Sequence, residues 1–544
     1  MRDRFFSCPG GSEGALSHAR IALRHWWPVA AVCAGLGVCA CGSEAAGSSS
    51  TAHRPASAPR TASVTRTAAA TSGRARSSRS APSAAGDDWP QFGYSDQRTN
   101  NGPAHTGITA ATLKRLRRRV VALPGTADSS AIELNRVTVK GRVRDVVVLT
   151  TSYGRTLAIN ARTGARLWEY TPSDIGSYAG SPQFTTASPT ADPDHRYVYA
   201  ATPDGEIHKL RLATGREVRS AHWPARMTLD PTREKLASPP SIDGSHLIVV
   251  TDGYVGDAPA YQGHVVEISR ATGRIQAVFN SLCSNVRHLM QPSSCPYSDS
   301  AIWGRAGAVV ERNGDILVAT SNGATSETTT FNGRTNWSDS VLELSPKRLR
   351  LLHNWTPSDQ LHLTQNDLDL GSTSPALLPG DLAVQGGKSG ELSLLNLKEL
   401  DGTRGPAGPR TGGQLQTIAA PGSTDVFSQP AVATIDGTTY VFVTTSGGTA
   451  AYRLAGRRLS VAWEDSTSGT SPIVAGGLLY VYDETGGALI VRSPKTGRQL
   501  ASLPAAQGHW NSPIVADGRI FLPTGNANDH ASSGVLDIYH LKGS

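Results

Sequence analysis

The chain has 544 residues, a formal net charge of +8, 56 Gly, 33 Pro and only 18% charged residues. Positions 1–86 hold ten Arg and three acidic residues, a net charge of +7, so residues 87–544 carry about +1. This nearly neutral body argues against nucleic-acid binding. Its Gly and Pro content favours a turn-rich, all-β protein over a helical one.

The first predicted element is an export signal. Arg20 and Arg24 precede the apolar run WWPVAAVCAGLGV (26–38), which is too short to span a bilayer as a mature helix. The run leads into Val-Cys-Ala-Cys, which resembles the lipobox of bacterial lipoproteins. We expect lipidation at Cys41, because the small residue Ala40 occupies the cleavage position. A plain secretory signal is the alternative, so the protein is expected on the outer face of the cell membrane or secreted.

Residues 42–86 form the second segment, rich in Ala, Ser, Thr, Pro and Arg and almost without large apolar side chains. Such a segment cannot bury enough surface to offset the entropy lost on ordering. We expect a disordered tether between the signal with its lipobox (1–41) and a folded body (87–544), with the membrane as a partner through the lipid anchor.

Two cysteines belong to the folded body. Cys283 and Cys295 lie twelve residues apart in a loop rich in Pro and Ser. Because the protein is expected outside the cytosol, the spacing predicts a disulfide between them.

The body repeats two short phrases. SPIVAGGLLYVY (471–482) and SPIVADGRIFLP (512–523) are nearly the same, and weaker copies begin at Ser188, Ser238, Ser372 and Ser428. A second phrase with alternating apolar residues and a Thr-Gly turn follows most copies, as in LAINARTGARLWEY (157–170). Both phrases describe short strands joined by tight turns.

Eight such strand-rich units are predicted, at 144–170, 196–221, 246–280, 307–355, 374–400, 428–464, 471–503 and 512–543. A small sheet with two uncovered faces cannot stand alone, and radial stacking buries both faces. The sequence therefore predicts an all-β, eight-bladed β-propeller of four-stranded antiparallel blades. WD40 and kelch propellers fit less well because their signature residues do not recur, and an array of β-sandwiches is the non-propeller alternative.

One copy of the second phrase carries a family resemblance. Ala158, Asn160, Thr163, Gly164 and Trp168 match A-x-D/N-x-x-T-G-x-x-x-W, which resembles the repeat of the PQQ-type quinoprotein (quinoprotein alcohol dehydrogenase-like) propellers. Residues 88–116, which precede the first blade, resemble the segment before the propeller in quinoprotein alcohol dehydrogenases. The resemblance extends over about 88–541. It implies that the Trp ending a blade stacks on the next blade, a part that would fall to Trp168, Trp355 and Trp463.

The resemblance also implies a site for PQQ and Ca²⁺. In segments similar to those of the family, Trp303 would lie under the cofactor, Asn322 would bind Ca²⁺ and Lys388 would contact a quinone oxygen. Asp367 or Asp369 would be the catalytic base and a metal ligand. The family's Glu ligand has no counterpart in 252–269, where we assign Asp257 to the missing carboxylate.

Each of these residues also has a structural interpretation. Asn322-Gly323 suits a hairpin turn, the two Asp suit backbone capping, Lys388 suits a hairpin tip and Trp303 suits the core. Two functions therefore remain open. One is a PQQ- and Ca²⁺-dependent dehydrogenase of a small alcohol or sugar, and the other is a non-catalytic scaffold that binds protein or polymer partners at the cell surface.

Overall fold

The computed structural model describes residues 88–254, 258–326, 328, 331–400 and 411–543. The predicted lipidation site Cys41, the tether and Asp257 lie outside these residues. Within the described part of the chain, none of the helices has the length and apolar character needed to cross a membrane.

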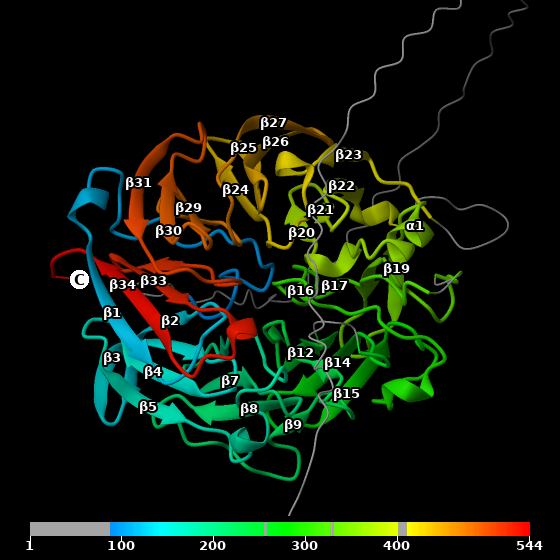
Figure 1. Ribbon diagram of the computed structural model, residues 1–544, viewed down its shortest axis with the longest axis horizontal. Coiled ribbons are helices and arrows are strands. Elements are labelled where there is room, and N and C mark those ends of the chain that lie inside the picture. The colour runs from blue at the N-terminus through cyan, green and yellow to red at the C-terminus, as the bar shows by residue number, and fades with distance from the viewer. Residues whose placement is uncertain (1–87, 255–257, 327, 329–330, 401–410, 544) are drawn as a thin grey trace, which may run out of the picture. The chain divides into compact units, whose positions relative to one another are not determined.

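Thirty-two strands form eight four-stranded antiparallel sheets arranged as a ring (Figure 1), which confirms the predicted propeller. We number these sheets as blades in chain order. Blades 1 and 2 contain β2 (Ile132–Val139), β3 (Arg142–Thr150), β4 (Thr156–Asn160) and β5 (Arg166–Tyr170), then β6 (Thr190–Ala191), β7 (Tyr197–Ala201), β8 (Glu206–Arg211) and β9 (Ala225–Arg226). Blades 3 and 4 contain β11 (Ser241–Asp243), β12 (His246–Val250), β14 (His264–Ser269) and β15 (Ile275–Asn280), then β16 (Val309–Val310), β17 (Ile316–Ala319), β18 (Val341–Leu344) and β19 (Leu351–Trp355).

The second half of the ring follows the same order. Blades 5 and 6 contain β20 (Ala376–Leu378), β21 (Leu382–Gly386), β22 (Glu391–Asn396) and β23 (Gln416–Ala419), then β24 (Ala431–Ile435), β25 (Thr438–Thr445), β26 (Gly448–Ala455) and β27 (Arg458–Asp465). Blade 7 contains β28 (Ile473–Ala475), β29 (Leu478–Asp483), β30 (Ala488–Arg492) and β31 (Gln499–Pro504). Blade 8 contains β32 (Ile514–Ala516), β33 (Arg519–Thr524), β34 (Gly534–His540) and, as its outermost strand, β1 (Arg117–Leu123).

Few described elements lie outside the blades. They are the two-stranded ladder of β10 (Glu234–Lys235) and β13 (Asp252–Gly253), the helix α1 (Gln360–Gln365) and the short 3₁₀ helices at Leu113–Arg115, Ile175–Ser177, Pro292–Ser294, Leu370–Ser372, Leu397–Glu399, Pro421–Ser423 and Ala527–Asp529. Cys283 and Cys295 form the predicted disulfide in the loop after β15.

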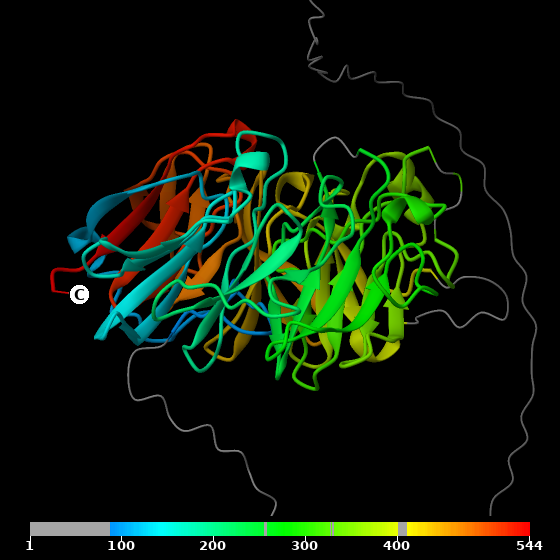
Figure 2. The same cartoon turned by 90° about the horizontal axis from the view of Figure 1, so that it is seen from below.

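Five of the eight predicted units had wrong bounds. The unit at 144–170 left out β2, the unit at 196–221 left out β6 and β9, and the unit at 246–280 left out β11. The eighth unit was placed wholly within 512–543, but its outer strand is β1, which pairs with β34 from Arg117↔His540 to Leu123↔Gly534. Figure 1 shows this blue strand beside the red one, and Figure 2 shows the same closure edge-on. The fifth unit was ended at residue 400, before its fourth strand β23. β1 and β23 lack a clear alternation of apolar residues because they are outer strands whose side chains are partly exposed to solvent.

Sheet burial decreases from the inner to the outer strand of a blade. In blade 7, β28 is buried throughout and β29 is buried up to its last residue, whereas β31 alternates between exposed and partly buried positions. Adjacent blades pack these apolar faces against each other, so the core is a ring of interfaces rather than a single centre.

The Thr-Gly turns provide the contact between neighbouring blades. Trp168 of blade 1 donates from Nε1 to the Leu212 carbonyl of blade 2 at 2.7 Å and covers Gly215 of the Thr-Gly turn there. Trp463 of blade 6 does the same with the Pro494 carbonyl and Gly497 of blade 7. These two contacts agree with the role that the family resemblance implied.

Two further interfaces also contain a Trp. Trp355 of blade 4 packs in one cluster with Leu397 and Leu400 of blade 5. Trp223, which the sequence did not single out, lies over Gly273 of blade 3.

Gly215→Ala is predicted to destabilise the fold through both its backbone and its neighbour. The φ of Gly215 is +72°, and an added Cβ would lie 2.6 Å from the Trp168 ring. Gly141 is a matched control, because its φ is +75° and a Cβ there would meet nothing within 4 Å. We expect Gly141→Ala to cost about 1–2 kcal/mol of unfolding free energy and Gly215→Ala about 1–3 kcal/mol more, measured by chemical denaturation. Equal losses in the two variants would contradict the packing role of the turn.

Candidate functional site

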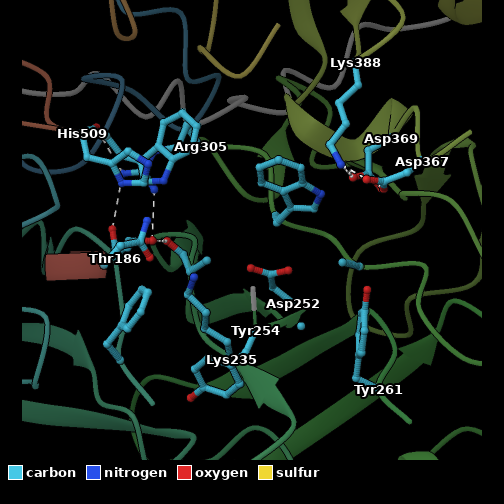
Figure 3. A pocket seen from close by; sticks show the side chains of 17 residues that line it. Thr186, Lys235, Asp252, Tyr254, Tyr261, Arg305, Asp367, Asp369, Lys388 and His509 are labelled. Atoms are coloured by element: carbon cyan, nitrogen blue, oxygen red, sulfur yellow. Dashed lines mark hydrogen bonds and ion pairs between the residues drawn. The ribbon is translucent and has the colours of Figure 1, made fainter. Parts of the chain in front are cut away.

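A cavity of about 330 Å³ opens among the loops that lead into the inner strands. Loops before β6, β11, β16, β20 and β32 contribute to it, from blades 2, 3, 4, 5 and 8. Because blades 4 and 8 lie opposite each other in a ring of eight, a cavity that both of them line must be central. Figure 3 shows its side chains, which include Phe184, Lys235, Asp252, Trp303, Arg305, Asp367, Asp369, Lys388, His509 and Trp510.

Three residues predicted for the site form an ion-paired group in this cavity. Lys388 Nζ lies 2.6 Å from Asp369 Oδ2 and 3.0 Å from Asp367 Oδ1. Lys388 occupies the hairpin between β21 and β22, whereas both carboxylates come from the segment before β20. The side chain of Asp367 is 54% exposed and that of Asp369 is 11% exposed, so Asp369 is the member shielded from water.

Trp303 forms one wall of the cavity. Its Nε1 donates to Ser321 Oγ at 2.7 Å, and the ring is partly exposed rather than part of the core. Lys388 Nζ lies 5.7 Å from the centre of this ring, and Phe427 packs against it at 5.7 Å. The indole therefore presents a face to the cavity, fixed in orientation by one hydrogen bond and one aromatic contact.

Asn322 lies beside Asp369. The backbone N–H of Asn322 points to Asp369 Oδ1 at 3.3 Å, and its side-chain nitrogen donates to the Gly323 carbonyl at 3.0 Å. The side-chain oxygen Oδ1 is buried and accepts no hydrogen bond. Asn322 begins the long connection between β17 and β18 and not a two-residue hairpin, so turn geometry does not explain it.

The pKa of Asp369 reflects competition between burial and charge. Burial raises this pKa to about 6, although Lys388 acts in the opposite direction. Burial alone would lower the pKa of Lys388, but its two carboxylate partners raise it. Asp339 lies deeper, where burial and the charge of Asp369 raise its pKa well above the usual value. Asp369 is therefore a carboxylate that changes protonation state at mildly acidic pH.

Two further buried cations were missed by sequence reasoning. Arg305, two residues after Trp303, donates to the Thr186 hydroxyl at 3.2 Å, and burial lowers its pKa to about 10. Lys235 lies 4.6 Å from the centre of the Phe184 ring, and burial lowers its pKa too. Together with Lys388 they give the cavity three basic side chains.

Asp252 also lines the cavity, between the Lys388 group and Arg305 in Figure 3. The sequence prediction chose Asp257, which lies outside the described residues, and overlooked Asp252 five positions earlier. Asp252 follows β12 directly and pairs in the ladder with Lys235 (Lys235↔Asp252), so the sheet itself holds it at this end of blade 3.

A buried carboxylate positions the part of the cavity wall that blade 8 contributes. Asp128 accepts from the backbone N–H of Trp510 at 2.7 Å, from that of Ala527 at 3.0 Å and lies 2.8 Å from His509 Nδ1. Burial would raise the pKa of Asp128, but these partners lower it overall. Asp128 precedes blade 1 and its partners belong to blade 8. The hydrogen bonds of Asp128 therefore connect the first and last blades and also hold Trp510 in the cavity.

A sequence signal for the missed residues does exist. The recurring Ser-Pro phrase marks the start of an inner strand, and the residues just before it lie at the cavity. Lys235 precedes Ser238-Pro239, and His509 and Trp510 precede Ser512-Pro513. Asp367 and Asp369 precede the weaker copy of the phrase at Ser372 in the same way.

The donor set fits a planar anion together with a hard cation. An aromatic face and three basic groups suit a flat molecule that carries carboxylates. The unpaired oxygen of Asn322 and the carboxylate of Asp369 are oxygen ligands of the kind that Ca²⁺ prefers. Asp369 lies in a position to exchange a proton with a molecule bound in the cavity.

Solved structures of quinoproteins share this fold. The chain is similar to the quinohemoprotein alcohol dehydrogenase of Comamonas testosteroni, with a TM-score of 0.60, 15% identity and coverage of 84% of this chain and 81% of that one. It is also similar to quinohemoprotein alcohol dehydrogenase ADHIIG of Pseudomonas putida HK5, with a TM-score of 0.64, 13% identity and the same coverage. A europium-containing methanol dehydrogenase gives a TM-score of 0.61 at 13% identity, over 84% of this chain and 98% of that one.

Sequence comparison gives the family. None of the curated proteins matches the chain. The PQQ-repeat family model described as outer membrane protein assembly factor BamB matches residues 125–279 and 312–503, which is more than half of the chain. The protein therefore belongs to this family of PQQ-repeat β-propellers.

Proposed function

We propose that this protein is an oxidoreductase of the quinoprotein type, which binds PQQ and Ca²⁺ in the central cavity and oxidises a small alcohol or sugar. The observation that supports the proposal is that Trp303, Asp369 and Lys388 line one cavity. Asn322 is buried beside them, with its backbone N–H bonded to Asp369. These residues come from separate loops of blades 4 and 5. The family resemblance implied Trp303, Asn322 and Lys388, and it left Asp367 and Asp369 as alternatives.

Each of the cavity residues would have its own role in binding PQQ and Ca²⁺. PQQ is planar and carries three carboxylates, so Trp303 would support its ring and Lys388, Arg305 and Lys235 would face its anionic groups. Asn322 and Asp369 would contribute oxygen ligands to Ca²⁺, whose remaining ligands would come from the cofactor and water. When bound, PQQ would supply a quinone that accepts hydride, with its carbonyl polarised by Ca²⁺.

Asp369 is the residue of this chain best suited to act on the substrate. Its pKa of about 6 leaves it ionised at neutral pH, so it can accept the proton of a substrate hydroxyl. The ion pair with Lys388 orients the carboxylate, and the surrounding burial limits competition from water.

The alternative function is a non-catalytic propeller that binds protein or polymer partners at the cell surface. One observation favours it, since Lys388 already neutralises both Asp367 and Asp369, the carboxylates on which a cation would depend. Cofactor uptake separates the two functions, because a scaffold needs none.

Asn322→Ala should abolish cofactor uptake. The change removes the buried oxygen that has no partner, and we expect PQQ binding in the presence of Ca²⁺ to weaken by at least about 100-fold. Equilibrium dialysis of the full chain measures it, with Asn313→Ala as control, an exposed Asn in a turn of the same blade. Equal uptake by Asn322→Ala and the control would contradict the assigned role, and no uptake by the unaltered protein would favour the scaffold.

Turnover should depend on the ionisation of Asp369. Because the proton acceptor must be charged, dye-coupled alcohol oxidation should rise with pH. The midpoint should lie at or below pH 6, since a bound Ca²⁺ lowers the pKa of Asp369 from the cation-free value of about 6. Asp369→Asn should lower kcat by about 10²–10⁴-fold. Lys388→Met should move the profile to higher pH, because burial then acts on Asp369 without its counter-charge. Lys398→Met, which breaks the exposed pair with Asp381, should leave the profile in place, and a profile that Lys388→Met does not move would contradict this assignment.

We also propose that the protein is exported and held at the outer face of the cell membrane by lipid on Cys41. Cys41→Ser should eliminate incorporation of labelled fatty acid and release the protein into the medium, whereas Cys39→Ser should change neither. Labelling that persists in Cys41→Ser would rule out this anchor.

A further inference from the structure

A second group of ligand-forming side chains lies at the other end of blade 3. Asp243 ends β11, His246 begins β12 and Glu267 belongs to β14. The register pairs Asp243 with His246 and His246 with Ser269, two residues from Glu267, so all three side chains lie on one face of the sheet. This face packs against blade 4. Asp252 at the cavity follows the far end of β12, six residues or about 20 Å along the strand from His246.

The three side chains converge. One ligand atom from each lies within 4.8 Å of the other two, and His246 Nδ1 is 3.4 Å from Glu267 Oε1. The side chain of His246 is 20% exposed, and that of Asp243 is also partly exposed. The group is therefore open to an ion from solvent on one side and closed by blade 4 on the other.

Glu267 is the unusual member of the group. Its side chain is fully buried, yet neither carboxylate oxygen takes part in a hydrogen bond. Burial and the charge of Asp243 raise its pKa to about 7, whereas the backbone N–H and the charge of Lys347 act in the opposite direction. A buried carboxylate whose one ion-pair contact is a His at 3.4 Å is costly. Because it also points at a second carboxylate, this group would be stabilised by a cation.

The distance between His246 and Glu267 matches two ligands of a tetrahedral ion. Two ligands at about 2.1 Å from a tetrahedral metal are separated by about 3.4 Å, which is the distance between His246 Nδ1 and Glu267 Oε1. One imidazole nitrogen and two carboxylates suit zinc or a related first-row ion, whereas Ca²⁺ and Mg²⁺ prefer oxygen ligands alone. Three protein ligands leave the fourth position to water.

The protein contains a natural comparison for this group. Asp204, Glu206 and His208 also converge, but His208 is already satisfied. Its Nδ1 is bonded to Glu217 and Tyr170, and its Nε2 is bonded to Thr202. A ring whose two nitrogens both have close partners is not available to a metal. The contact at His246 Nδ1 is longer, 3.5 Å from Ser245 Oγ, so hydrogen bonding distinguishes the two groups where composition does not.

We infer that Asp243, His246 and Glu267 form a binding site for one divalent transition-metal ion of the zinc type, separate from the central cavity. The ion would neutralise Glu267 at the interface between blades 3 and 4. This site does not depend on the proposed oxidoreductase function, and it would exist equally in a scaffold.

Titration of the metal-free full chain with Zn²⁺ by calorimetry tests the inference. We expect one ion per chain, and we expect Co²⁺ in its place to give the intense visible absorption of a tetrahedral site. Glu267→Gln should fold, because it removes a buried charge and keeps the shape, and should weaken Zn²⁺ binding by more than about 100-fold, the upper end for loss of an outer-shell partner. Asp243→Asn, at a partly exposed position, provides a second variant with the same expectation.

Glu206→Gln in the comparison group is the matched control and should leave Zn²⁺ binding unchanged. Failure of the unaltered chain to bind Zn²⁺, or binding that survives in both Glu267→Gln and Asp243→Asn, would overturn the inference. Loss of binding in Glu206→Gln instead would place the ion in the other group and would overturn it as well.

Discussion

The structure depends on the pairing of its first and last strands, β1 and β34, in blade 8. β1 pairs with β34 over seven residues, and Arg118 bonds both oxygens of Asp537 at 2.9 Å across that pair. Arg519 of β33 lies 3.1 Å from Glu133 and 3.1 Å from Asp145 of blade 1, with almost no access to water. Without these contacts blades 1 and 8 would expose a sheet edge and an apolar face. Closure is therefore what turns eight weak sheets into one body.

Closure also creates the site. Every blade enters its inner strand at the same face of the ring, so the loops before these strands meet only if the ring is complete. Asp128 illustrates the connection, because one buried carboxylate joins the start of blade 1 to the loop of blade 8 that carries Trp510. The cavity thus combines side chains from blades on opposite sides of the axis, and loop substitutions can alter its chemistry with little effect on the interfaces between blades.

The sequence predicted the repeated parts of this protein better than the single ones. Period-two patterning and Thr-Gly turns recur, so they identified eight blades, and the family resemblance implied the stacking of Trp168 and Trp463. The strand β1 was missed because its run of Arg does not resemble a propeller strand until β34 is beside it. Family motifs pointed to Trp303, Asn322, Lys388 and one of Asp367 and Asp369. Lys235 precedes a Ser-Pro phrase that could have indicated it, whereas Asp252 and Arg305 were recognised only when the fold brought their loops together. Glu267 has an ordinary place in an alternating strand, and only its burial without a partner distinguishes it.

The central claim is that the closed ring assembles a cofactor pocket from Trp303, Asn322, Asp369 and Lys388. A crystal structure of the protein grown with PQQ and CaCl₂ tests this claim most directly. The account predicts a planar molecule stacked on Trp303, a cation bound by Asn322 Oδ1 and Asp369, and Lys388 turned toward the molecule. A cavity that stays empty at saturating PQQ, with Lys388 still paired to Asp367 and Asp369, would contradict it.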